Sequence, residues 1–539
     1  MCPPKSHSSN PNVESRSESI DRRPQSRDGS TRSSISMGDE ESPMARIERL
    51  GRARPEKFKS TWEEVGFCFS IVMSQVLTEY FISGFNVLLP TLAKDLNIPR
   101  ASQTWPANAF SLVVACFLLT FGRLADMYGG WPVYVSGFVW LCVWSLIAGF
   151  SQNELMLDLC RAIQGFGPAA YLPASFILLG STYRPGPRKN IVFSIYGAAA
   201  PFGFYVGIFF AGVTAQFDVW RWFFFIGTIL AAITAVTSYC FIPSDMEERE
   251  SMGVRMDWLG AILIPAGLIA IVFAITDSSH APQKWATPYI YILLIVGVLI
   301  LGAAVYVEGW VAMQPLLPFD LFKVKSMTPL MIALLFSYGS LGIFLFYGTF
   351  YMTDILGRTP LQLVAWFSPM AIGGIIIATA GGFVLHILPG TVLVIVSGIA
   401  WIIAPLLFAI APSDASYWAY TFPAMICATI AIDVTFNVSN IFISTSFPLA
   451  RQGLAGALST SVLELGVALF LGLGDLVVTE TAEEGLEKSY KNVFWVEVAV
   501  AGVALVLLVG FVKIDSAKSD MTADERVAAL REEEGGEGR

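Results

Sequence analysis

Polar side chains occupy one face of an otherwise apolar stretch around residue 80. Gln75, Glu79, Ser83 and Asn86 follow one another at spacings of four, four and three residues, so a helix places all four on one side. Desolvation among apolar neighbours favours the protonated form of an acid. Such an acid can take up and release a proton when water reaches it. The alternative is an acid that stays protonated and donates a hydrogen bond between helices.

A second polar face lies in the other half of the chain. Its members are spaced by four, four, three and four residues: Thr429, Asp433, Asn437, Asn440 and Ser444. Asp433 lies near the middle of its apolar run, as Glu79 does. We predict that at least one of Glu79 and Asp433 exchanges protons. Gln75, Ser83, Asn86, Thr429 and Asn437 are predicted to line a wet cavity between helices.

Glu464 is a third candidate acid for proton exchange. Its helical face also carries Gly456, Thr460, Ala468 and Gly472, and such small residues suit close helix packing. Aromatic residues near the predicted cavity are candidates for contact with an apolar ligand. On this ground Tyr347 and Tyr351 are predicted to line the cavity.

Arg161 is a basic residue inside an apolar run. A charge at that depth is costly and is usually functional. Asp158 lies three residues earlier on the same helical face and could neutralise it. The functional interpretation and this local ion pair are both open.

The composition requires long apolar elements to position these groups. Hydrophobic residues make up 54% of the 539 residues and charged residues only 14%, against about 25% charged in a soluble domain. So few charges cannot cover a soluble surface, which argues against an enzyme, a nucleic-acid binder or a fibrous protein. The chain is predicted to be a polytopic, all-α membrane protein.

Fourteen apolar runs, each near the ~20 residues that a helical span needs, lie between residues 64 and 513. Residues 1–60 are rich in Ser, Pro, Arg and Glu and are predicted to form a disordered cytosolic tail. We divide the rest into a six-helix bundle (61–242), two inserted helices with a linker (243–326), a second six-helix bundle (327–513) and a second cytosolic tail (514–539).

The basic residues favour both termini on the cytosolic side of the membrane. An even number of spans places the termini together, and the loops on their side hold nine Lys and Arg residues against seven in the opposite loops. The three histidines, His7, His280 and His386, form no metal-ligand set. No phosphate-binding G-x-x-x-x-G-K-[ST] sequence is present, so we expect no cofactor, no metal and no use of ATP.

A loop after the second apolar run carries Gly122, Asp126 and Gly129 in the order G-R-L-A-D-M-Y-G-G. This loop resembles the G-x-L-a-D-r-x-G-r-r motif of the major facilitator superfamily, whose aspartate belongs to a charge network that latches one conformation. The trailing basic residues of the motif are replaced here by Gly130 and Trp131. The fourth run carries Arg161 and Gly165 in a stretch similar to the family motif l-x-x-x-R-x-x-q-G.

Two further stretches and the fourteen spans narrow the resemblance. Residues 220–223 read W-R-W-F, and residues 256–261 read M-D-W-L-G-A, similar to the D-w-x-G segment that opens span seven. Residues 65–512 thus resemble the drug:proton antiporter family with fourteen spans, most of all its fungal aminotriazole-resistance and boron-exporter branch.

The antiporter motif of the family, g-x-x-x-G-P-x-x-G-G, is incomplete in span five. Gly203 and Gly207 are present, but the proline and the second glycine of the motif are missing. The family also often has an Asp where this chain has Phe81, with the nearest acid at Glu79. A stripe of small residues for close helix packing is the alternative interpretation of Gly203 and Gly207.

The resemblance implies a secondary transporter in which two bundles rock about a site near the midplane. Proton-coupled export of a small organic compound, such as a drug, toxin or secondary metabolite, across the plasma membrane is the leading prediction. The alternatives are transport of a small inorganic solute such as borate or ammonium, and a nutrient sensor without transport. The vacuolar membrane is the alternative location. We expect protons, a small-molecule substrate and the lipid bilayer as partners, no nucleic acid, and a monomer.

Overall fold

A computed structural model describes residues 54–183, 187–251, 253–446 and 452–514. Within these ranges the chain is helical and has no strand. Fourteen of its helical segments are long and apolar enough to cross a membrane, which confirms the predicted all-α architecture with fourteen spans. Most of the predicted tails, 1–60 and 514–539, lies outside the described residues.

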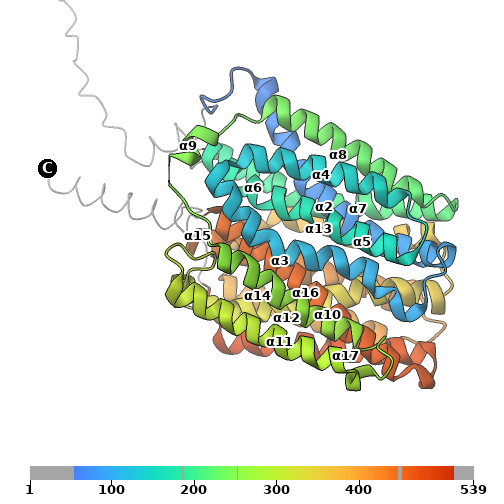
Figure 1. Ribbon diagram of the computed structural model, residues 1–539. Coiled ribbons are helices and arrows are strands. Elements are labelled where there is room, and N and C mark those ends of the chain that lie inside the picture. Colours follow the sequence, from blue (N-terminus) through green and yellow to red (C-terminus); the bar gives the residue numbers. More distant parts are fainter. Residues whose placement is uncertain (1–53, 184–186, 252, 447–451, 515–539) are drawn as a thin grey trace, which may run out of the picture. The chain divides into compact units, whose positions relative to one another are not determined.

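The N-terminal bundle contains six spans. They are formed by α2 (Thr61–Asp95), α3 (Thr104–Tyr128), α4 (Gly130–Gly149), α5 with α6 (Glu154–Gln164 and Phe166–Thr182), α7 (Pro187–Gln216) and α8 (Arg221–Phe241). Helices α5 and α6 form one span that is interrupted at Gly165. Figure 1 shows these helices running nearly alongside one another.

Two inserted helices follow the short helix α9 (Met246–Glu250). They are α10 (Trp258–Asp277) and α11 (Pro288–Tyr306), and a π-helical turn, η3 (Val307–Val311), extends α11. In Figure 1 they lie side by side, with α10 next to α3 and α16. A linker with the 3-10 turn η4 (Phe319–Lys323) leads to the second bundle.

The C-terminal bundle also contains six spans. Their helices are α12 (Met327–Phe350) with the π-turn η5 (Tyr351–Ile355), α13 (Pro360–Ile387), α14 (Gly390–Ile410), α15 (Phe422–Ser446) preceded by η6 (Tyr417–Thr421), α16 (Gln452–Glu480) and α17 (Leu486–Phe511). The remaining single turns are η1 (Arg100–Ser102), η2 (Lys284–Ala286) and η8 (Ala482–Glu484).

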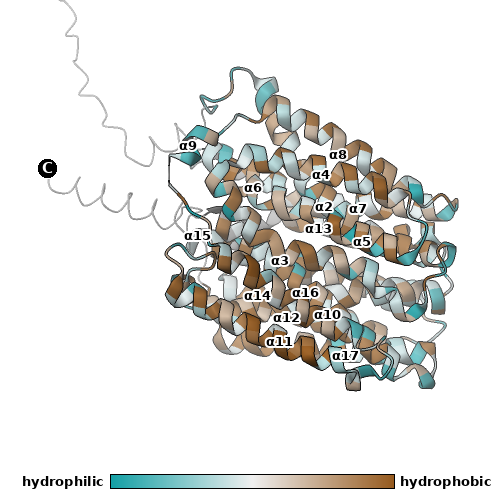
Figure 2. Ribbon diagram, viewed as in Figure 1, coloured by the Kyte–Doolittle hydropathy of each residue, from teal (hydrophilic) through white to brown (hydrophobic). Residues whose placement is uncertain are grey.

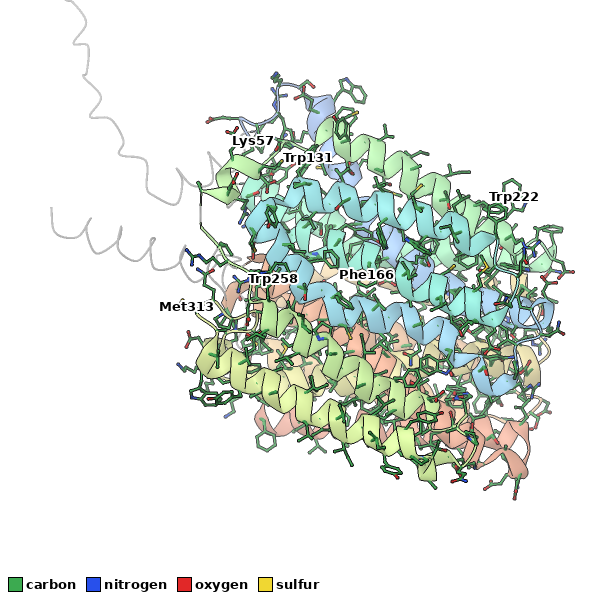
Figure 3. The ribbon with its side chains drawn as sticks, viewed as in Figure 1. Lys57, Trp131, Phe166, Trp222, Trp258 and Met313 are labelled. Carbon is green, nitrogen blue, oxygen red and sulfur yellow. The ribbon has the colours of Figure 1, made fainter. Side chains whose placement is uncertain are left out.

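The helices are apolar along their length and polar at their ends, as Figure 2 shows. Lipid offers no partner to a backbone N–H or C=O group, so each span satisfies its own backbone as a helix. Polar caps end the helices where water is available: the Ser60 side chain accepts a hydrogen bond from the Glu63 N–H at the start of α2. We call the end of the molecule where α2 begins and α17 ends the tail end. Figure 3 labels Lys57, Trp131, Trp258 and Met313 at this end and Trp222 at the other.

The folded part begins before the predicted boundary at residue 61. Phe58 is buried, and its ring lies 5.2 Å from that of Phe67 and 6.5 Å from that of Tyr183. Residue 58 had been assigned to the disordered tail on composition. The correction arises because one aromatic side chain in a polar segment suffices to anchor it on a helix bundle.

The two bundles meet along a few helix pairs that surround the centre of the molecule. Helix α3 packs against α16, and α7 packs against α13. Within the N-terminal bundle the closest pair is α2 and α7. A Cβ atom on Gly203 would lie 2.5 Å from Cα of Val76, and one on Gly207 would lie 2.7 Å from Cα of Tyr80. The small-residue stripe of α7 is therefore a contact surface for α2.

Candidate functional site: a cavity between the two bundles

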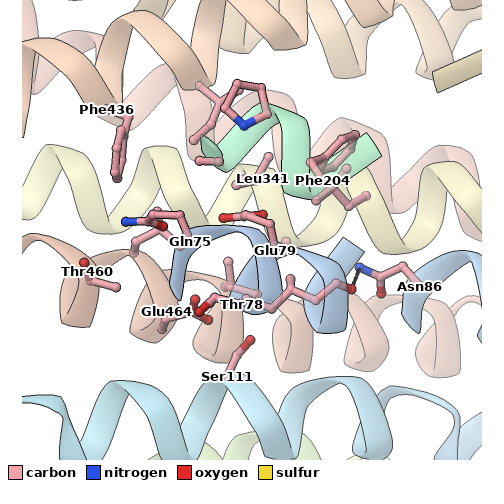
Figure 4. Close-up of a pocket in the computed structure, with 18 of the residues that line it drawn as sticks. Gln75, Thr78, Glu79, Asn86, Ser111, Phe204, Leu341, Phe436, Thr460 and Glu464 are labelled. Atoms are coloured by element: carbon pink, nitrogen blue, oxygen red, sulfur yellow. Dashed lines mark hydrogen bonds between the residues drawn. The ribbon is translucent and has the colours of Figure 1, made fainter. Parts of the chain in front are cut away.

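Three acids from three helices line one cavity in the membrane-spanning part. Glu79 comes from α2, Asp433 from α15 and Glu464 from α16, and the cavity has a volume of about 110 Å³. Figure 4 shows Glu79 and Glu464 on neighbouring helices, with Ser111 next to Glu464. The structure therefore brings together the three predicted proton-exchange candidates, one from the first bundle and two from the second.

Three of the predicted cavity residues also belong to the lining. Gln75 and Asn86 extend along α2 on either side of Glu79, and Asn437 lies one turn beyond Asp433. The Asn437 side-chain amide donates to the backbone carbonyl of Asp433 at 2.8 Å. Helical periodicity alone explains this part of the site, because all these residues share the polar faces read from the sequence.

The remaining lining is largely apolar, with a few polar side chains that the sequence reasoning had not assigned to the cavity. Thr78, Ser111 and Thr460 are the polar additions. The apolar part includes Phe204, Leu341, Leu345, Met370 and Phe436. A mostly apolar concave site with a small number of convergent polar groups is typical of small-molecule binding sites.

Arg161 forms hydrogen bonds to three separate elements at the edge of the cavity. Its Nε atom donates to the Pro106 carbonyl at 3.1 Å, one Nη atom to the Phe81 carbonyl at 3.1 Å, and the other to Oε1 of Gln164 at 2.8 Å. The guanidinium also lies 4.1 and 4.4 Å from the ring centroids of Phe85 and Phe110. It is 1% exposed, so these contacts replace its hydration.

The local ion pair considered for Arg161 does not form. Among the described residues no acid lies within ion-pair distance of its guanidinium, and Oδ1 of Asp158 has no hydrogen-bond partner. The two side chains diverge because Arg161 is directed at α2 and α3. Glu464 lines the same cavity as Arg161, and its Oε2 atom is unpaired.

Four other predicted cavity residues lie outside the lining. Ser83 donates to the carbonyls of Glu79 and Phe204, so it joins α2 to α7. Thr429 donates to the carbonyls of Met425 and Met370, which joins α15 to α13. Their hydroxyl groups are used in helix packing, which corrects their prediction as cavity residues.

Tyr347 and Tyr351 are turned into the second bundle. The Tyr347 ring centroid lies 6.0 Å from that of Tyr490, and the Tyr351 ring packs against Phe408 and Phe494. Helix α12 directs a different face at the cavity, the one that carries Leu341 and Leu345. The sequence indicated that this span borders a cavity but did not fix its rotation about its axis.

The segment predicted as a loop is largely helical, because Gly122 and Asp126 lie in the last two turns of α3 and only Gly129 lies beyond its end. It is at the tail end, where Arg249 of α9 approaches it. Arg249 approaches Asp126 with an Nη1 to Oδ1 distance of 3.7 Å, and Gly129 adopts a φ of 105°. Gly122 packs against Pro173 and Ala457, so this end of α3 also contacts the second bundle. Arg249 thus supplies a cation where the motif's trailing basic residues are missing.

Asp245 completes the cluster around this loop. Its two carboxylate oxygens accept hydrogen bonds from the backbone N–H groups of Gly130 and Trp131 at 2.9 and 3.0 Å, which are the free amides at the start of α4. Neither Asp245 nor Arg249 was predicted, because the loop between spans six and seven has no periodicity that would place it against α3 and α4.

The glycines of the other motifs make close helix contacts. Gly165 lies against the carbonyl of Phe110 at the point where α5 passes into α6. Gly203 and Gly207 contact the α2 backbone, as described above. A packing role therefore accounts for all three positions.

Two buried acids outside the cavity were also not predicted. Asp475 of α16 accepts a 2.6 Å hydrogen bond from Ser279 and lies 3.4 Å from Nε2 of His280, just beyond the end of α10. Burial lowers the pKa of His280, although its hydrogen bond to the Thr276 carbonyl acts in the opposite direction. In the second bundle, the buried Glu497 accepts a 2.9 Å hydrogen bond from Ser340. An acid inside an apolar run was the available signal for both.

Comparison with known proteins assigns the family. Residues 71–471 match the family model of the Major Facilitator Superfamily. This match covers more than half of the chain.

The chain belongs to the major facilitator superfamily.

Its relatives are named as transporters. The chain is 34% identical to the low affinity ammonium transporter of Saccharomyces cerevisiae over 84% of this chain and 88% of that protein. It is 33% identical to the aminotriazole resistance protein of the same yeast, over 84% of each. It is 30% identical to efflux pump terJ of Aspergillus terreus, over 90% of this chain and 94% of the pump. The resemblance drawn from the motifs is confirmed, and the chain is a transporter and not an enzyme.

Solved structures share the fold. The nucleoside transporter NupG covers 83% of this chain with a TM-score of 0.55 and 16% identity, and all but a small part of NupG is matched (98%). The human organic anion transporter MFSD10 covers 81% of this chain with a TM-score of 0.51 and 13% identity. At these identities the likeness concerns the architecture of a superfamily member alone.

Proposed function

We propose that this protein is a proton-coupled secondary transporter that exports a small organic compound from the cell. The observation that carries the proposal is the convergence of Glu79, Asp433 and Glu464 on one cavity, with contributions from both bundles. Alternating access requires a central site that both bundles form, so that its exposure changes when they rock. Proton coupling requires acids that alternate between a dry and a wet environment in the same cycle.

The arrangement of charge in the cavity favours protonation in the closed state. All three acids would place like charges around a space of about 110 Å³, and Arg161 is the cation on its edge. Simultaneous ionisation of the three acids is unfavourable in such a site. Opening to one side admits water, which stabilises the carboxylates and allows a proton to leave.

The same lining favours a substrate that carries an amine or another positive group. A carboxylate released from its proton can bind an ammonium or amidine group of the substrate, while Phe204, Leu341 and Phe436 contact its apolar part. Competition between a proton and a cationic group for one carboxylate is by itself a mechanism of antiport. Relatives named as an efflux pump and an aminotriazole resistance protein agree with export of small organic compounds.

Ammonium transport is the second candidate. The cavity volume of about 110 Å³ exceeds the roughly 10–15 Å³ that one water-sized ligand needs in the same measure, and a relative is named as a low affinity ammonium transporter. A small cation would fit this state without further opening, whereas a larger organic compound requires the bundles to separate.

We propose the plasma membrane as the location, with both termini in the cytosol and a single chain as the transporting unit. The loop charges support this orientation. Epitope tags at the two ends should resist protease added outside intact cells, and cleavage of either tag would contradict the orientation.

The direct test is transport by purified protein in lipid vesicles with an imposed pH gradient. The panel comprises aminotriazole, methylammonium as the ammonium probe, and a set of larger organic cations. A gradient of one pH unit corresponds to about 1.4 kcal/mol, a tenfold accumulation per coupled proton. Accumulation that follows the gradient and collapses with a protonophore supports coupling. Equal fluxes with and without the gradient would contradict it.

Carboxyl-to-amide variants identify the coupling residue. Glu79→Gln and Asp433→Asn keep the shape and hydrogen bonding of the side chains but cannot titrate. We expect at least one of them to lose gradient-driven accumulation and retain substrate exchange. Glu497→Gln is the control, because Glu497 is a buried acid of a membrane span that lies outside the cavity lining. Full accumulation by both cavity variants and by the double variant would remove these two residues from the mechanism.

A further inference from the structure

Two carboxyl groups face each other where the inserted helices meet the linker, far along the chain from the cavity acids. Asp257 is the N-cap of α10, and its Oδ1 accepts a hydrogen bond from the Gly260 N–H at 3.1 Å. Glu308 lies in the turn that extends α11, and its Oε2 accepts one from the Leu317 N–H at 3.0 Å. Each carboxyl group thus has one oxygen bound to a backbone amide.

The two remaining oxygens point at the same place and have no donor. Oε1 of Glu308 and Oδ2 of Asp257 lie 2.1 and 2.7 Å from the point that a Cβ atom on Gly260 would occupy. Both atoms are buried, and neither has a hydrogen-bond partner. Glu308 is 6% exposed. In the D-w-x-G segment that opens this span, Asp257 therefore caps the helix and also contacts Glu308. Gly260 leaves the space in which the two carboxyl groups meet, because it has no Cβ atom.

No cation neutralises the pair. Four basic residues lie on neighbouring segments at the tail end, namely Arg123, Arg249, Arg255 and Lys323. Within the described residues, none of them is within ion-pair distance of either carboxyl group. Arg249 is engaged with Asp126 and Asp245, and Lys323 with Asp320. Two buried acceptors that face each other without a donor are unfavourable, and one proton between them converts the contact into a strong hydrogen bond.

The pair lies at a junction of three parts of the molecule. The Leu317 N–H that binds Glu308 belongs to the linker, and Arg123 near the end of α3 donates to the carbonyls of Gln314 and Pro315 in the same linker. The Arg255 N–H donates to the Gln314 side chain at 2.8 Å. Figure 3 labels Trp258 and Met313, which neighbour the pair in the sequence, at this tail end.

We propose that Asp257 and Glu308 form a proton-binding site that holds one shared proton and fastens the inserted helices to the linker. The site is independent of the cavity and of the proposed proton coupling. Binding of the proton joins the start of α10 to the end of α11 and, through the Leu317 amide, to the segment that Arg123 holds. Loss of the proton places two negative charges against each other and weakens that junction.

Thermal stability as a function of pH tests the proposal without any transport assay. A proton bound in the folded state but not in the unfolded state stabilises the protein at low pH, and this contribution is lost as the pH rises. We expect the melting temperature of the purified protein in detergent to fall by about 2–4 °C from this source as the pH is raised from 6 to 9. The contribution is isolated as the difference between wild type and variants.

Glu308→Gln and Asp257→Asn each replace the shared proton by an amide N–H that can donate to the remaining carboxylate. Asn is as good an N-cap as Asp, so the cap of α10 is kept. Because both residues share one proton, either single variant should remove the whole contribution, and the double variant should remove no more. Glu247→Gln, an exposed acid on α9 at the same end, is the control and should leave the pH dependence as in wild type.

Three outcomes would overturn the proposal. If the two single variants each remove a part of the pH dependence of the melting temperature, and the double variant removes the sum of these parts, then the two acids titrate independently. A pH dependence of both single variants equal to that of wild type would show that no proton is bound at the pair. Specific stabilisation of wild type by sodium over choline at pH 9, absent in Glu308→Gln, would show a metal cation in place of the proton. If one single variant does not fold, the other is compared with wild type by infrared difference spectroscopy. Wild type should show a protonated-carboxyl band at pH 6 that is absent at pH 9. The variant should lack this band at both pH values.

Discussion

Replacement of Gly207 by alanine tests whether the interrupted antiporter motif of α7 is a packing surface. A Cβ atom at this position would lie 2.7 Å from Cα of Tyr80, 2.6 Å from the Tyr80 carbonyl oxygen and 2.9 Å from Oγ of Ser83. Two of these three atoms are backbone, so a change of rotamer cannot relieve the contact. Ordinary contact begins near 3.4 Å, and α7 would have to move away from α2 by about 0.7 Å.

The expected cost follows from this displacement. Overpacking a well-packed interface costs about 1–3 kcal/mol, and alanine recovers up to about 1 kcal/mol of helix propensity relative to glycine. The net loss of stability is therefore roughly 0–3 kcal/mol for Gly207→Ala and should be larger for Gly207→Val. The hydrogen bond that joins these two helices, from Ser83 to the Phe204 carbonyl, would lengthen with the shift.

The assay is thermal unfolding in detergent, followed with a thiol-reactive dye that reports exposure of the buried Cys116 and Cys160. Gly302→Ala on α11 is the matched control, because Gly302 is exposed and has no atom within 4 Å of its virtual Cβ. We expect a progressive fall of the melting temperature from Gly207 to Ala to Val, and no fall for the control. An unchanged melting temperature for Gly207→Val would refute the packing interpretation of this stripe.

Two further predictions concern single basic residues. The Arg161→Lys variant should reach the membrane but lose at least about 90% of transport. The reason is that one ammonium group cannot bind the Pro106 carbonyl, the Phe81 carbonyl and the Gln164 side chain together. Near-normal flux would show that only the charge of Arg161 matters. His280 has a pKa lowered mainly by burial, so the unfolded state binds a proton that the folded state does not, and stability should fall as the pH drops through about 6.5. His280→Gln should reduce this acid-side loss of melting temperature; an identical loss would place its cause elsewhere.

The hydropathy of the sequence determined the class of fold. A segment of some twenty apolar residues in lipid has to form a helix, since no other local structure satisfies its backbone. Fourteen such segments could therefore be counted without coordinates. The helical period of 3.6 residues per turn also determined that Gln75, Glu79 and Asn86 share one helix face. It placed Asp433 and Asn437 together on another. These residues are the part of the cavity that the sequence identified correctly.

Tertiary structure decided everything that depends on how a helix is rotated and which helix it meets. The polar face of α2 contacts both α7 and the cavity. Only the packing of α2 against α7 determines that Ser83 bonds to α7 and that Glu79 lines the cavity. The few polar side chains of α12 do not indicate its rotation, so the sequence directs Tyr347, and Tyr351 just after it in η5, at the cavity, whereas both are turned into the second bundle. Arg161 reaches α2 and α3 in preference to its sequence neighbour Asp158 for the same reason.

Contacts between distant segments were beyond local patterns altogether. Arg249 meets Asp126, and Glu308 meets Asp257, across 123 and 51 positions of the chain. Spacing rules connect residues within one helix, where geometry is fixed by the backbone. A pair drawn from a loop and a helix end depends on the packing of whole elements, and that packing is settled only when the complete bundle folds.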